Sequence, residues 1–224
     1  MAAAMVERLN RNPPWRLPYL KYTGASTPAA LLPKVQLIGD LIYSKAPPSR
    51  EEVLPTITKL VQTGEVEQAK DLWFAVQNAS GSLYDPAFDH LMRTGGSPFE
   101  WTQLSVLGAN VKTEPVRDGK NGAVLSVTTD GAAAGILLRQ LLALAPGEHI
   151  LDYRGVIPTN ARQAFGWQVR CLKAGTLLST IGATSPPYRF LVPKDCQSQY
   201  IELRVTSNPG AAGSEVTFNQ LIVR

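Results

Sequence analysis

Three side chains able to perform acid–base or metal chemistry fall within five residues of the stretch LALAPGEHILDYRG. They are Glu148, His149 and Asp152. The Pro-Gly pair predicts a turn, so the stretch has the pattern of strand, turn and strand, with Glu148 at the turn. Side chains alternate along a strand, so His149 and Asp152 are expected on opposite faces. We therefore interpret the three groups as the rim of a hairpin and keep a glycan hydrolase using Glu148 and Asp152 as an alternative.

The two cysteines, Cys171 and Cys196, are the only ones in the sequence. Two interpretations stay open: a disulfide between neighbouring strands, or two buried free thiols that pack as small hydrophobic side chains. A zinc site is not expected, because the pair lacks CxxC spacing and nearby histidines. Serine-hydrolase and phosphate-cradling motifs are absent, and GKNG at Gly119–Gly122 is interpreted as a hairpin turn. The sequence thus predicts no catalytic residues, no metal and no cofactor, and hence a protein that is not an enzyme.

A sugar site needs an aromatic platform for the ring and polar groups for its hydroxyls. Trp101 and Trp167 lie in runs typical of a buried core, and Tyr188, in a loop after two prolines, is the aromatic most expected to be exposed. Tyr200 and Arg162 belong to the wider set of candidates. The predicted ligand-binding residues are Tyr153, Asp152, Arg154, Arg170, Gln168 and Tyr188.

Composition and charge narrow the function classes. The 224-residue chain carries a net charge of +4 without a basic cluster, so no nucleic-acid partner is expected. No apolar run approaches the ~20 residues that a membrane-spanning helix needs. The first ten residues, MAAAMVERLN, lack the pattern of a signal peptide. We expect either a cytosolic protein or one whose leader or anchor is missing from the sequence.

The first third of the chain has helical periodicity. Apolar residues recur every three or four positions over Pro28–Lys45, which predicts a helix. Ser49 and Glu52 have the spacing of a capping box, and the helix that they begin is expected to stop at Gly64. A third helix is predicted over Glu65–Gln77. The preceding segment LNRNPPWRLPYLKY is rich in proline and aromatic residues, which predicts an irregular arm that packs on the helices.

The remainder of the chain alternates short apolar runs with turn residues, as in an antiparallel sandwich. We predict an α+β, mainly β, chain: a helical hairpin or short helical repeat over residues 1–79, then a jelly-roll β-sandwich over residues 80–224. The predicted strands are Phe99–Leu107, Ala123–Thr128, Ile136–Leu144, His149–Arg154, Phe165–Leu172, Leu177–Ile181, Tyr188–Val192, Tyr200–Val205 and Glu215–Val223.

Two resemblances extend this prediction. The segment TKLVQTGEVEQAKDLW resembles a tetratricopeptide-type helical hairpin, with Ala69 where the helices approach, although a plain helical hairpin fits it equally well. The second half resembles a carbohydrate-binding module of the galactose-binding-like jelly-roll type. Asn219 and Gln220 replace two aspartates of that pattern, so a carried-over calcium site is not expected. The matching residues are Phe88, Asp89, Phe99, Trp101, Gln140, Leu142, Leu144, Pro146, Gly147, His149, Leu151 and Phe218–Val223.

More narrowly, the chain resembles the C-terminal part of uncharacterised proteobacterial envelope proteins, in which helical repeats precede a jelly roll. The resemblance favours the disulfide and implies a periplasmic or cell-surface location. It also implies a non-catalytic role in extracellular polysaccharide production, with a polysaccharide or an envelope protein as partner. A structural protein–protein interaction module without a glycan ligand is the alternative. The matching residues are Trp167, Val169, Cys171, Val192, Pro193 and Cys196.

Overall fold

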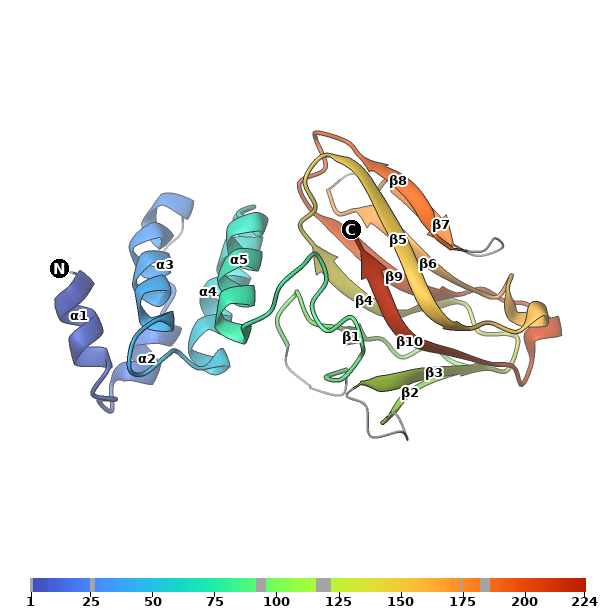
Figure 1. Cartoon of the computed structure of the whole chain (residues 1–224), viewed down its shortest axis with the longest axis horizontal. Coiled ribbons are helices and arrows are strands. Elements are labelled where there is room, and N and C mark those ends of the chain that lie inside the picture. Colours follow the sequence, from blue (N-terminus) through green and yellow to red (C-terminus); the bar gives the residue numbers. More distant parts are fainter. Residues whose placement is uncertain (1, 25–26, 92–95, 116–121, 174, 182–185) are drawn as a thin grey trace. The chain divides into compact units, whose positions relative to one another are not determined.

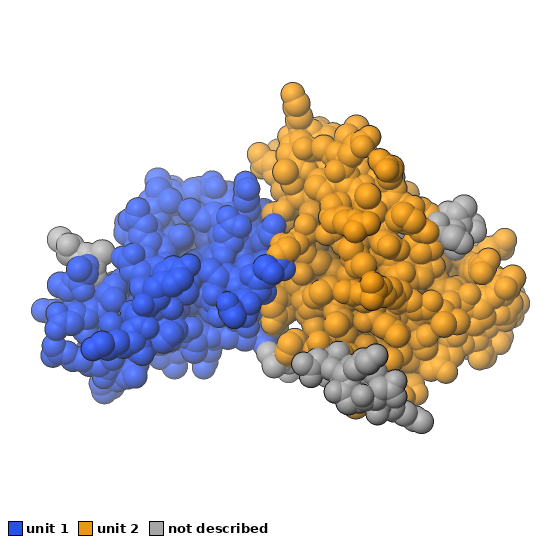
Figure 2. Space-filling view, viewed as in Figure 1, with its two compact units in different colours: residues 1–80 blue, residues 81–224 orange. Residues whose placement is uncertain are grey.

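The computed structural model describes residues 2–24, 27–91, 96–115, 122–173, 175–181 and 186–224. The chain divides into two compact units, Met1–Ser80 and Gly81–Arg224, which are coloured separately in Figure 2. The first unit contains helices and the second contains strands, as Figure 1 shows. No helix in the described ranges combines the length and the apolar character needed to cross a membrane.

The helical unit contains five helices in the described residues. α4 and α5 form a hairpin, and α3 packs against both of them. The predicted irregular arm was wrong in part, because six of its residues form α2. The helices are α1 (Ala2–Leu9), α2 (Arg16–Lys21), α3 (Pro28–Ile42), α4 (Arg50–Gln62) and α5 (Val66–Gln77).

The start of α4 is a capping box, as the sequence predicted. The backbone N–H of Ser49 donates to Glu52 Oε2 (2.8 Å), and the backbone N–H of Glu52 donates to Ser49 Oγ (3.3 Å). Each side chain therefore satisfies a backbone donor that the first helical turn leaves unpaired. This arrangement fixes the point at which α4 begins.

A buried arginine connects this cap to the rest of the helical unit. Arg16 on α2 donates from Nε to Glu52 Oε1 (2.7 Å) and from Nη2 to Glu52 Oε2 (3.1 Å). Its Nη1 donates to the carbonyl oxygen of Leu9 (2.9 Å) and its Nη2 to that of Ala46 (3.1 Å). One guanidinium thus joins α2 to the end of α1, to the loop before α4 and to the α4 cap.

The second unit is a β-sandwich, so the predicted α+β fold with an antiparallel sandwich is confirmed. Its two sheets have the strand orders β1-β4-β9-β6-β7 and β2-β3-β10-β5-β8, and every pairing is antiparallel. The strands are β1 (Thr102–Gln103), β2 (Ala109–Pro115), β3 (Ala123–Thr129), β4 (Gly135–Leu142), β5 (Gly147–Val156), β6 (Phe165–Cys171), β7 (Leu177–Ile181), β8 (Tyr188–Val192), β9 (Gln199–Val205) and β10 (Glu215–Val223).

Two strand predictions differ from the structure. The predicted strand Phe99–Leu107 was too long, because only the two residues of β1 pair there. Trp101 is buried instead, and its Nε1 donates to the carbonyl oxygen of Asp85 (3.0 Å). The strand β2 was missed. The hairpin turn predicted at Gly119–Gly122 falls largely outside the described residues.

An aromatic cluster fills the interior between the sheets. Trp167 is fully buried, and its ring centroid lies 5.7 Å from that of Trp101 and 5.4 Å from that of Phe218. Phe88 packs on both tryptophans. The interpretation of Trp101 and Trp167 as core residues is confirmed. A disulfide joins Cys171, at the end of β6, to Cys196, in the segment before β9.

Candidate functional site

The six predicted ligand-binding residues lie in three different places on the sandwich. Asp152 and Arg154 lie on the outward face of β5, because Leu151 and Tyr153, which alternate with them, pack toward the core. The Asp152 carboxylate accepts a hydrogen bond from the backbone N–H of Tyr153 (2.8 Å). Gln168 and Arg170 lie on the outward face of β6, in the other sheet. The structure therefore does not bring these two pairs together.

Tyr153 and Tyr188 lie on the inward face of their strands. Both pack against the hydrophobic core, and the Tyr153 ring makes an edge-to-face contact with Phe218 (5.4 Å). Burial raises the pKa of the Tyr153 hydroxyl, Tyr188 raises it further, and Arg162 opposes the shift. The expectation that Tyr188 is the exposed aromatic was wrong, because Tyr188 is the first residue of β8, where the alternation turns its ring toward the core.

The acidic groups of the opening stretch are farther apart along their strand than the spacing of a glycosidase pair. β5 begins at Gly147, so Glu148 belongs to the strand and not to a turn as predicted. Glu148 and Asp152 share the outward face and are four residues apart, which corresponds to about 13 Å along a strand. Glycosidase carboxylates are about 5–9.5 Å apart. His149 lies on the opposite face, and its Nε2 is 2.8 Å from the carbonyl oxygen of Ala145.

A cluster of polar side chains crosses the outward face of the other sheet. In β9, Ile201, Leu203 and Val205 point into the core, so the intervening side chains point outward. The antiparallel register places residues of β4 and β6 directly beside them. We call this surface the arginine face; its residues are Arg139, Gln168, Arg170, Tyr200, Glu202 and Arg204.

Register places Glu202 at the centre of the arginine face. It lies opposite Arg139 on β4 and opposite Gln168 on β6. Although it points away from the core, Glu202 is only 4% exposed, and its Oε2 lies 3.3 Å from Arg204 Nη1. A buried carboxylate is costly unless it is paired, and Arg204 supplies that partner.

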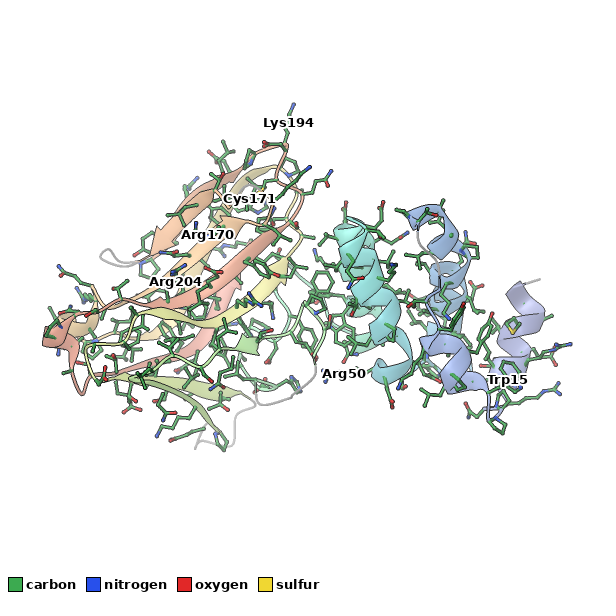
Figure 3. All side chains as sticks on the ribbon, turned by 180° about the vertical axis from the view of Figure 1, so that it is seen from behind. Trp15, Arg50, Arg170, Cys171, Lys194 and Arg204 are labelled. Atoms are coloured by element: carbon green, nitrogen blue, oxygen red, sulfur yellow. A yellow bond between two sulfur atoms is a disulfide. The ribbon has the colours of Figure 1, made fainter. Side chains whose placement is uncertain are left out.

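The other arginines are also held in place. The Arg139 guanidinium lies over the Tyr200 ring, 5.3 Å from its centroid, which is a cation–π contact. Arg170 donates from Nη1 to the carbonyl oxygen of Gly175 (2.8 Å) and from Nη2 to Gln168 Oε1 (3.3 Å). Arg170 and Arg204 are labelled in Figure 3 and come from the adjacent strands β6 and β9.

A cleft adjoins the arginine face at Arg204. Its volume is about 720 Å³, and its walls come from the segment after β1 and from the β3–β4 connection. Leu104, Val106 and Ile136 give it apolar surface, and Arg204 and Asp130 give it charged groups. Apolar walls with a few polar groups are typical of small-molecule and sugar sites. The cleft extends the arginine face toward the end of the sheet.

Sequence reasoning missed Arg139 as a site residue, because it interrupts an apolar run that looked like core. Glu202 and Arg204 carried a signal, since they alternate with the apolar residues of β9, but the alternation alone does not identify their neighbours. Among the described residues, no three histidine, cysteine, aspartate or glutamate side chains gather as metal ligands would. The face therefore presents arginines, an amide, a carboxylate and a phenol ring.

Comparisons with known proteins identify no family for this chain. No protein-family model matches it, and no curated protein does either. Several solved structures are similar at low identity. Accessory secretory protein 1, 2 and 3 of Streptococcus pneumoniae is 13% identical over 65% of this chain and 98% of that chain, with a TM-score of 0.40.

Two other solved structures are carbohydrate-binding modules. A CBM4 structure is 16% identical over 63% of this chain and 98% of that one, with a TM-score of 0.43. TmCBM61, solved in complex with β-1,4-galactotriose, is 12% identical over 65% of this chain and 99% of that one, with a TM-score of 0.42. At these identities and scores, the site chemistry has to be argued from the residues of this chain.

Proposed function

We propose that the sandwich binds a glycan on the arginine face and that the protein has no catalytic activity of its own. The observation that supports this proposal is the register of β4, β9 and β6, which brings an aromatic ring, an amide and three guanidinium groups onto one surface, around the buried Glu202. Sugar hydroxyls need both donors and acceptors, and the apolar face of a sugar ring packs on aromatic surface. The arginine face supplies all of these groups.

We further propose that the protein works in the cell envelope, in a periplasmic or cell-surface location, in extracellular polysaccharide production. The disulfide between Cys171 and Cys196 supports an oxidising compartment, because cytosolic thiols are usually kept reduced. Titration of thiols in the protein, isolated from its own cells without reductant and then unfolded, tests this proposal. Two reactive thiols in the unfolded, unreduced chain would contradict it.

A glycan array with the full chain tests the binding proposal. Gln168→Ala removes an amide from the arginine face, and we expect it to weaken binding of any glycan found. Gln220→Ala is the matched control, because it removes the same group from the outward face of β10 in the other sheet. Equal effects of the two substitutions, or no binding to any glycan on the array, would contradict the proposed site.

A protein partner for the helical unit is the second candidate function. Tyr22 and Tyr43 are 75% and 88% exposed, and Trp15 and Tyr19 are also exposed. Tyr19, Tyr22 and Lys34 line a cleft of about 320 Å³. Exposed aromatic side chains are enriched at protein interfaces. We propose that these helices, which resemble a tetratricopeptide hairpin in sequence, act as the scaffold that binds an envelope protein, and cross-linking through a photoreactive residue at Tyr43 tests it.

A further inference from the structure

We propose that the arginine face selects a negatively charged glycan, one whose sugars carry carboxylate groups, over a neutral one. The inference rests on the proposed function, because it names the class of glycan that the same face binds. It follows from three features of the face: its charge, the type of its cationic residues and the way they are fixed.

The two sheets of the sandwich differ in charge. The strands of the sheet that carries the arginine face contain three arginines and one carboxylate, Glu202. The strands of the opposite sheet contain three basic and four acidic residues, and several of these form ion pairs with each other, such as Lys112 with Glu114 and Arg189 with Glu148. Counted over the described strand residues of the two sheets, the sheet with the arginine face therefore has a net positive charge and the other does not, so the arginine face attracts anions.

The one carboxylate of the face is already committed. Glu202 is buried and paired with Arg204, so it adds little negative potential at the surface. A neutral sugar would gain from exposed carboxylates as hydroxyl acceptors, as it would from amides. The described strands of this sheet carry three guanidinium groups, which attract anions. They carry no exposed carboxylate that could accept hydrogen bonds from a neutral sugar. This imbalance favours a ligand that brings its own negative charge.

All three cations are arginine. A guanidinium presents a planar fork of N–H groups that matches a carboxylate with two parallel hydrogen bonds. The cation–π contact with Tyr200 holds the Arg139 guanidinium in place, and Arg139 is half-buried. Arg170 is held by two acceptors and is also half-buried. The geometry is therefore suited to carboxylates and is fixed before a ligand binds, which lowers the entropy lost on binding.

The spacing of the arginines suits a chain with repeated charges. The register sets Arg204 and Arg139 one strand and two residues apart, which corresponds to about 8 Å between their Cα atoms. Arg139 and Arg170 are two strands and two residues apart, about 12 Å. Arg204 and Arg170 lie on adjacent strands and four residues apart in register, about 14 Å, so the three Cα atoms form a triangle with Arg204 beside the cleft. An acidic oligosaccharide that crosses this triangle can bring more than one of its carboxylates near a guanidinium.

The test compares one glycan with and without its charge. Isothermal titration calorimetry of the full chain is carried out with oligogalacturonate and with the same oligomer after chemical reduction of its carboxyl groups. We expect the acidic form to bind at least about tenfold more tightly than the reduced form, and we expect this difference to shrink as salt screens the charges.

Two variants and a matched control locate the effect. Arg139→Gln and Arg170→Gln should each weaken binding of oligogalacturonate about tenfold and leave binding of the reduced form nearly unchanged. Both positions are used in preference to Arg204, whose loss would leave Glu202 buried without its partner. Arg189→Gln removes the same charge from the opposite sheet and should change the affinity less than twofold. Thermal melts confirm that each variant is folded.

The outcomes separate this inference from the proposed function. Equal binding of the acidic and reduced oligomers, weakened alike by Arg170→Gln, would overturn the inference and leave the glycan site standing. Binding of neither oligomer, nor of any glycan on the array, would overturn both. Equal binding of a single-stranded DNA oligonucleotide of matched charge, or an equal loss in Arg189→Gln, would show general attraction of polyanions and overturn the selectivity for a glycan.

Discussion

Replacing Arg16 with methionine should destabilise the helical unit more than any single exposed substitution. The variant keeps an unbranched side chain but leaves the Glu52 carboxylate, which is 6% exposed, without its partner. Removing one partner of a buried ion pair costs about 3–5 kcal/mol. A unit of this size usually has a free energy of unfolding of about 4–12 kcal/mol. We therefore expect Arg16→Met to remove about a quarter or more of the stability of the helical unit.

Urea unfolding of the full chain, followed by the helical circular dichroism signal, measures this loss, because the described α-helices all belong to the first unit. Arg11→Met is the matched control: Arg11 pairs with Glu7 on the surface, where such pairs contribute about 0.5 kcal/mol or less. The double variant Arg16→Met/Glu52→Leu should recover part of the loss. Equal midpoints for Arg16→Met and Arg11→Met would refute the proposed role of the buried pair.

Three further predictions concern pH, the disulfide and the ligand. Burial alone would raise the pKa of Glu52, but the hydrogen bonds and charge of its partners hold it below its usual value. The lowered pKa contributes to the free energy of unfolding above the usual glutamate pKa of about 4.3, and this contribution is lost as the pH falls through the pKa of Glu52 in the folded protein. In Glu52→Gln, the free energy of unfolding should therefore fall less steeply as the pH is lowered. Replacing Cys171 and Cys196 with serine should lower the free energy of unfolding by about 3.5 kcal/mol, because the disulfide closes a loop with a sequence separation of 25 and so restricts the unfolded chain. The shift of the urea midpoint measures the change. Glu202→Gln should strengthen binding of oligogalacturonate several-fold in calorimetry at low ionic strength; weaker binding in a folded variant would mean that the carboxylate itself contacts the glycan.

Sequence patterns predicted the strands that have one buried face and one exposed face, because apolar and polar residues alternate along them. β6 and β9 alternate apolar and polar residues, and the structure buries the apolar set in each. β2 is the outermost strand of its sheet and buries only Val111, so its sequence ANVKTEP has no apolar period to detect. α2 was hidden by the prolines around it, and its position depends on Arg16, whose partners are distant in sequence.

The candidate site was harder to predict than the fold, because it depends on register between strands. Alternation within β6 identified Gln168 and Arg170 as outward residues. It did not show that Glu202, 34 positions later in the chain, lies directly beside Gln168, or that Arg139 lies on its other side. Tyr153 was assigned to a site by its residue type and Tyr188 by its position after two prolines, and the alternation of β5 and β8 turns both toward the core.

The disulfide also determines how the sandwich protects its edges. Cys171 and Cys196 enclose β7 and β8, and each of these is the outermost strand of its sheet. Without the covalent link, both strands can detach as one segment and expose unpaired backbone along β6 and β5. Exposed strand edges are templates for intermolecular pairing. Reduction should therefore make the protein aggregate or exchange strands between molecules, well before the aromatic core unfolds.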